Sequence, residues 1–172
     1  MSDAAVDFNI HSKCNKATEP ARAGRIMLLE SLLAYLHISA VLGLAVFLTA
    51  KVALLRAEVL DGKPQLLRRL WRLDNWCWGA FAAVALTGLA RVMFGVKGWH
   101  WYLSNPLLGV KLALFATMVA MGLPARAMLR RWLDAGQAPE RSALRSHRRW
   151  LMWQAHIMVV LPLFGVLLSY GY

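Results

Sequence analysis

The chain has 172 residues, of which 59% are apolar and only 17% charged, whereas ordinary soluble domains carry roughly 25% charged residues. A soluble domain of this length has too much surface for its volume to hide so many apolar side chains. The abundance of Trp, Phe and Tyr excludes a disordered chain. The net charge of +11 does not predict a nucleic-acid partner here, because the basic residues lie beside apolar runs, as in membrane proteins.

Four apolar segments follow one another along the chain. The runs 31–50 and 150–172 contain no formal charge, and each is long enough to cross a hydrocarbon core of roughly 30 Å as a helix. The runs 76–96 and 107–129 are apolar except for Arg91 in the first and for Lys111 and Arg126 in the second. The sequence therefore predicts an all-α, integral membrane, antiparallel four-helix bundle, with spans of about 27–49, 75–96, 107–128 and 150–170.

The first of these spans follows a polar tail, residues 1–26. Because composition changes abruptly at Ile26, we treat residues 27–172 as the transmembrane domain and Met27 as an alternative start of the chain. Between the first two spans, residues 65–73 alternate leucines with arginines, which predicts a short amphipathic helix at the cytoplasmic membrane surface.

The later connections contain familiar turn signals. After the second span, the segment KGWHWYLSNP has the aromatic residues of a membrane interface, and Asn105-Pro106 predicts a turn that opens the third span. Gly136 and Pro139 are expected to end the third helix and to open the fourth.

Basic residues predict the orientation of the bundle. Thirteen lie in or beside the connections 50–74 and 129–149, and seven lie on the other side. The positive-inside rule then places both connections in the cytoplasm and both termini outside it, in the cytoplasmic (inner) membrane of a bacterium. His147, within the sequence RSHRRW, is expected to belong to this cytoplasmic basic collar.

A few ionisable residues remain inside the spans, where charged groups are costly and each is a candidate site. From the helical rise of roughly 1.5 Å per residue, Glu30, Arg91 and Lys111 lie at one level on three helices, with Glu30 as the charge partner of the cations. His37 lies near the midplane, seven residues after Glu30 and hence on the same face. A stripe of small residues ending at Arg91 (Gly79, Ala83 and Thr87) predicts that Arg91 points into the bundle.

This arrangement suits a b-type haem. Imidazole at mid-depth is a common axial ligand of haem iron, so His37 is the candidate metal ligand. Arg91 and Lys111 would pair with the propionates, and Met118 or His156 would supply the opposite axial position.

Structural interpretations stay open for the same residues. His37 could be a hydrogen-bonding group between helices, and Arg91 and Lys111 could extend to the interface with Glu30 as counter-ion. Met118 could equally be a packing residue of the core, and His156 could belong to the cytoplasmic edge of the bundle.

Several segments together resemble a known family. They are LLAYLH at 32–37, WRLD at 71–74, TGLARV at 87–92 and VKGWHWYLSNP at 96–106, followed by Lys111. The order and spacing resemble a family of small bacterial four-helix membrane proteins known only as a domain of unknown function, over residues 27–172. The chain is more weakly similar to two other groups. Through its first-helix histidine, His37, it resembles the HemJ-type membrane protoporphyrinogen oxidases, a likeness that implies haem at that residue. Through the Leu36-His37 pair it resembles the CopD copper-resistance membrane domains.

Three functions follow as hypotheses. The first is a haem-binding membrane redox protein, with a haem-dependent oxidoreductase activity as one form of it. The second is a membrane transport or permeation protein for a metal or small solute, with the level of Glu30, Arg91 and Lys111 as its entrance. The third is a non-catalytic membrane scaffold subunit. The lipid bilayer is the expected partner, together with either a second copy of the chain or another subunit of a membrane complex.

Overall fold

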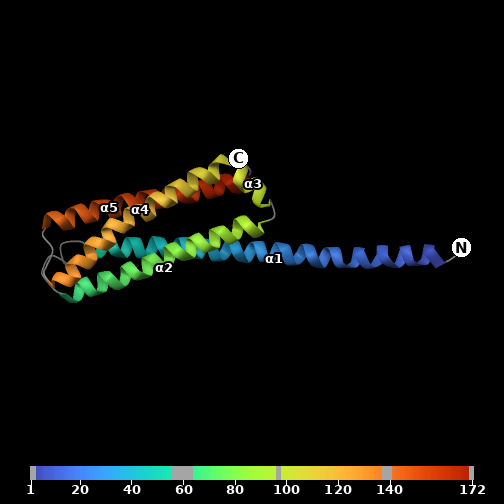
Figure 1. Cartoon of the computed structure of the whole chain (residues 1–172), viewed down its shortest axis with the longest axis horizontal. Coiled ribbons are helices and arrows are strands. Elements are labelled where there is room, and N and C mark those ends of the chain that lie inside the picture. The colour runs from blue at the N-terminus through green and yellow to red at the C-terminus, as the bar shows by residue number, and fades with distance from the viewer. Residues whose placement is uncertain (1–2, 56–63, 96–97, 137–140, 171–172) are drawn as a thin grey trace.

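A computed structural model describes residues 3–55, 64–95, 98–136 and 141–170, with side chains from residue 24 onward except those at 64, 141 and 169. Five helices form within these ranges (Figure 1). They are α1 (Asp3–Leu54), α2 (Pro64–Phe94), α3 (Trp99–Ser104), α4 (Pro106–Ala135) and α5 (Arg141–Tyr170).

The four long helices form a ring, in which α1 packs on α2 and α5, and α4 packs on the same two helices. The end of α1, the start of α2, the end of α4 and the start of α5 lie at one end of the bundle, and the short helix α3 lies at the other (Figure 1). We call these the basic end and the α3 end. The first half of α1 projects beyond the α3 end, so the polar tail continues the first helix (Figure 1).

All four long helices are long and apolar enough to cross a membrane, which confirms the predicted fold class. The candidate spans are Gly24–Leu54, Gln65–Phe94, Pro106–Ala135 and Ser142–Leu168. They contain the first and third predicted spans completely, and the second and fourth except for the last two residues of each. Val96, the predicted end of the second span, lies outside the described residues.

Each long helix contributes one stripe of side chains to the core, at alternating spacings of three and four residues. On α2 the buried positions are 67, 70, 74, 77, 81 and 84, and on α5 they are 144, 147, 151, 154, 158, 161 and, seven residues further on, 168. This seven-residue repeat is the packing pattern of left-handed helix bundles. Because the repeat fixes how each helix is rotated, it decides which polar residues enter the core.

Helix boundaries follow the local sequence where turn chemistry is strong. The Asn105 side chain accepts a hydrogen bond from the Leu107 N–H at 2.9 Å, and Pro106 opens α4, as predicted. Gly136 ends α4 with φ of 61°, a left-handed conformation that favours glycine. Pro139 lies outside the described residues.

The segment 65–73 is helical as expected, but it is not a separate surface helix. It forms the first turns of α2, and Leu67 and Leu70 are buried in the common core. The alternation of leucine and arginine indicated an amphipathic helix correctly, whereas the pattern could not distinguish a membrane surface from neighbouring helices as the place where the leucines are buried.

Candidate functional site

His37 lies on the core stripe of α1 and is 8% exposed. Its Nδ1 is 2.9 Å from the hydroxyl of Thr87 on α2. The Thr87 hydroxyl also donates to the Ala83 carbonyl at 2.6 Å, which leaves its oxygen free to accept from His37. In the tautomer with a proton on Nδ1, the lone pair lies on Nε2, an arrangement that suits a metal ligand.

The His37 ring packs directly against α2. A methyl group on Gly88 would lie 3.2 Å from His37 Cε1, so glycine at this position lets the ring approach the helix backbone. The helix interface and the hydrogen bond to Thr87 together fix the orientation of the imidazole.

Two cations from other helices surround this histidine. Arg91 lies two turns after Val84 in the stripe of α2, and Lys111 lies on α4, seven residues before the fully buried Met118. Both interact electrostatically with His37 and with each other. The Lys111 ammonium extends toward α5, where a methyl group on Gly165 would lie 3.3 Å from its Nζ. The α3 end of the bundle therefore gathers two positive charges around one oriented imidazole.

The stripe that directs Arg91 inward differs from the predicted one. Gly79 is exposed and has no neighbour within 4 Å of an added methyl group. The core stripe instead runs through Cys77, Phe81 and Val84, and Arg91 follows it at the same three- and four-residue spacing.

The other predicted site residues lie in different surroundings. Glu30 is half-buried, and within the described ranges no ion pair joins it to Arg91 or Lys111. Met118 lies in the core and is completely buried. His156 is exposed beside the core stripe of α5, with Nδ1 at 2.6 Å from the Met152 carbonyl oxygen. The structure brings His37, Arg91 and Lys111 together, and it leaves His156 at the bundle surface.

A second polar cluster, which the sequence analysis missed, lies near the basic end. Asp74 is 1% exposed, and its two carboxylate oxygens accept from Lys51 Nζ at 2.5 Å and from Arg126 at 2.6 Å. Arg126 also donates to Asn75 at 2.8 Å and lies over the ring of Trp71. The cluster joins α1, α2 and α4. By the helical rise from His37 to Lys51, it lies about 21 Å along the bundle from His37.

His147 and Gln154 are further polar residues of the core. His147 is 2% exposed and its ring centroid is 5.4 Å from that of Trp132, so this residue packs in the core instead of forming part of the predicted basic collar. Gln154 donates from Nε2 to the Met118 carbonyl oxygen at 2.7 Å. The seven-residue spacing from His147 to Gln154 was the available signal, because it continues through Leu161 as a core stripe.

The sequence position of Asp74 also indicates a buried ion pair. It is the only acidic residue between positions 62 and 133, at the start of a span and near several cations. A single acid in that setting needs a cationic partner if it is buried.

Comparison with known proteins identifies the sequence only at the level of a family. The model of the family DUF2214, described as a predicted membrane protein, matches residues 29–172. No curated protein and no solved structure matches the chain.

Proposed function

The chain belongs to this family of predicted membrane proteins, and we propose that it is a haem-binding redox protein of the membrane. The observation that carries the proposal is the buried His37 imidazole, whose Nδ1 lies 2.9 Å from the Thr87 hydroxyl, a contact that would leave Nε2 to bind a metal. Histidine that binds a metal usually donates its other ring N–H to a fixed acceptor in this way.

The charges around His37 support haem in particular. Arg91 and Lys111 are cations at apolar depth, and no carboxylate pairs with either of them in the described part of the chain. Cations at this depth are costly without anionic partners, and two propionates would supply them. Bound there, a b-type haem would provide a one-electron couple inside the membrane. His37 would hold the iron, and Met118 is the internal candidate for a second ligand, since His156 is exposed.

Absorption of the purified protein tests the proposal. Protein expressed with a haem precursor and purified in detergent is expected to show a strong Soret band, and His37→Ala is expected to abolish it. The exposed His100→Ala serves as the matched control and should keep the band. A colourless wild-type preparation, or loss of the band in both variants, would contradict the proposal.

The propionate contacts can be tested separately by haem titration. Arg91→Gln and Lys111→Gln each remove one charged partner, worth about 1.5–3 kcal/mol, so each is expected to weaken haem binding by roughly 10- to 100-fold. Arg131→Gln removes an exposed charge on α4 and should leave the affinity unchanged. Equal effects of all three variants would indicate a general effect of net charge.

A second candidate function is the binding and permeation of a small anion, since Arg91 and Lys111 would attract one without haem. The Lys51–Asp74–Arg126 cluster weighs against a continuous passage, because it joins three helices across the basic end. Anion flux into liposomes that contain the colourless protein would favour this alternative. If the flux persists after Lys111→Gln, the anion does not bind at Lys111 and the alternative is not supported.

We also propose that the protein resides in the cytoplasmic membrane of a bacterium with its basic end in the cytoplasm. The distribution of basic residues supports this orientation. A reporter that is active only outside the cytoplasm, fused after Tyr172, is expected to be active. The same reporter inserted at Gly136 should be silent.

A further inference from the structure

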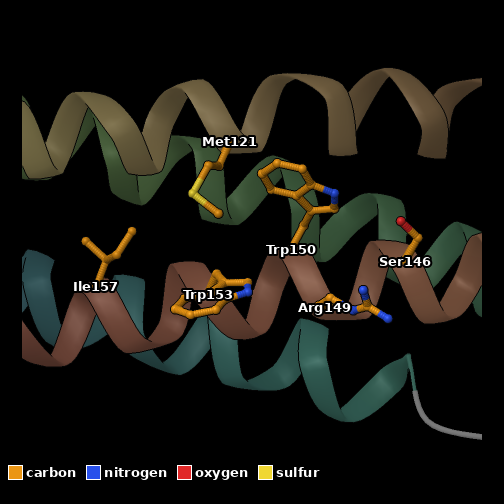
Figure 2. A pocket seen from close by; sticks show the side chains of 6 residues that line it. All are labelled: Met121, Ser146, Arg149, Trp150, Trp153 and Ile157. Carbon is orange, nitrogen blue, oxygen red and sulfur yellow. The ribbon is translucent and has the colours of Figure 1, made fainter.

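A groove of about 430 Å³ lies along the bundle surface between α4 and α5 (Figure 2). Met121 lines it from α4, and the other lining residues come from α5: Ser146, Arg149, Trp150, Trp153 and Ile157. The groove lies apart from His37 and its cations, and its volume is within the range of small-molecule sites.

The two ends of the groove differ in polarity. Ser146 and Arg149 lie at one end and Ile157 at the other, with the two indole rings between them (Figure 2). From Ser146 to Ile157 the helical rise gives a length of about 16 Å. The groove thus has a cation at the end near the membrane border and aromatic and aliphatic side chains along the rest of its length. This polarity matches an amphipathic molecule with an anionic head.

The outer wall of the groove is open to whatever surrounds the bundle. Trp150 is 51% exposed and Trp153 is 61% exposed, on a helix that is long and apolar enough to span a membrane. The medium at this surface is therefore lipid, which makes a lipid molecule the nearest occupant available.

The basic residues at the groove favour lipids with an anionic headgroup. No acidic residue occurs after Glu140, so nothing on α5 opposes the charge of Arg149. Arg145 precedes Arg149 by one helical turn and extends the same basic region. Basic pockets between spanning helices near a membrane surface bind anionic headgroups. We propose that this groove binds an anionic phospholipid, with its phosphate at Arg149 and Ser146 and an acyl chain along Trp153 and Ile157.

Quenching of tryptophan fluorescence by brominated lipids tests this proposal. The full chain is reconstituted in phosphatidylcholine vesicles that contain a small, equal fraction of either brominated phosphatidylglycerol or brominated phosphatidylcholine. The difference between wild type and Trp153→Phe isolates the signal of the groove. Brominated phosphatidylglycerol is expected to quench this signal about fivefold more effectively, the ratio that corresponds to about 1 kcal/mol for one basic residue at the membrane surface.

Two charge variants separate the groove from the general surface charge. Arg149→Gln is expected to abolish the preference for phosphatidylglycerol, whereas Arg131→Gln, an exposed cation on α4 outside the groove, should retain it. Equal quenching by both lipids, or equal losses in the two variants, would overturn the proposal. A third outcome would also overturn the proposal: if the protein is dimeric and neither lipid quenches the fluorescence, a second copy of the chain covers the groove.

Discussion

Replacing Asp74 with Asn is expected to destabilise the bundle more than the loss of either of its cationic partners. The carboxylate accepts from two cations on two other helices, at 2.5 Å from Lys51 and 2.6 Å from Arg126. Asparagine keeps the shape of the side chain but removes its charge. Lys51, whose side chain is 4% exposed, would then carry a buried and unpaired ammonium.

The loss of stability depends on which interactions Lys51 and Arg126 keep when Asp74 loses its charge. Removing one partner of a buried ion pair costs about 3–5 kcal/mol, chiefly because the remaining charge is left unpaired. Arg126 is better placed than Lys51, because its side chain is 32% exposed and it keeps Asn75 and the Trp71 ring. We therefore expect about 3 kcal/mol for Asp74→Asn, most of it from Lys51. Lys51→Met leaves Asp74 paired with Arg126 and should cost about 1–2 kcal/mol.

Equilibrium unfolding by SDS in mixed micelles measures the free energy of unfolding of each variant. The expected order of loss is Asp74→Asn, then Lys51→Met, with Asp134→Asn as the exposed control near zero. The reasoning would be refuted if Asp74→Asn cost only about 0.6 kcal/mol, the average for ordinary hydrogen bonds between helices in a membrane protein. A larger loss for Lys51→Met than for Asp74→Asn would refute it as well.

Three further predictions concern the helix contacts. Thr87→Val removes the acceptor that orients His37 and should weaken haem binding by about 10- to 100-fold in a titration; unchanged affinity would count against the tautomer argument. Gly88→Ala places a methyl group 3.2 Å from His37 Cε1 and should also weaken haem binding, without changing the helix content measured by circular dichroism. Gly122→Ala meets Gln154 Nε2 at 3.3 Å and should cost about 1–2 kcal/mol in SDS unfolding; an unaltered free energy would contradict this.

Hydropathy and turn chemistry were sufficient to predict most of the fold. A run of about twenty apolar residues must form a helix in a membrane, because the backbone has no other hydrogen-bond partners there. The start of α4 at Pro106 and its end before Gly136 depend on local backbone geometry, which single residues determine. Such features need no knowledge of neighbouring helices.

The rotation of each helix about its axis was harder to predict. Small residues predicted one stripe on α2, through Gly79, and the structure buries another, through Cys77 and Phe81. The two stripes converge at Arg91, so the inward placement of Arg91 was correct for a partly different reason. In lipid the apolar pattern surrounds the whole helix, and it therefore contains little information about which face meets a neighbour.

The ion-pair cluster could not be predicted from local sequence because its members are distant along the chain. Lys51 and Asp74 are 23 residues apart, and Arg126 is a further 52 residues away. By sequence, Lys51 and Arg126 are cations at the membrane border, where basic residues are common. Only the helix ring, in which α2 packs on both α1 and α4, brings the three side chains together.

The haem content of the purified protein tests the central proposal most directly. Extraction of the pigment and its assay as the pyridine complex give moles of haem per mole of chain. We predict a ratio near one for wild type and for His100→Ala, and only a trace for His37→Ala. A wild-type ratio near zero in cells supplied with haem precursor, or an undiminished ratio in His37→Ala, would contradict the assignment of His37 as the iron ligand.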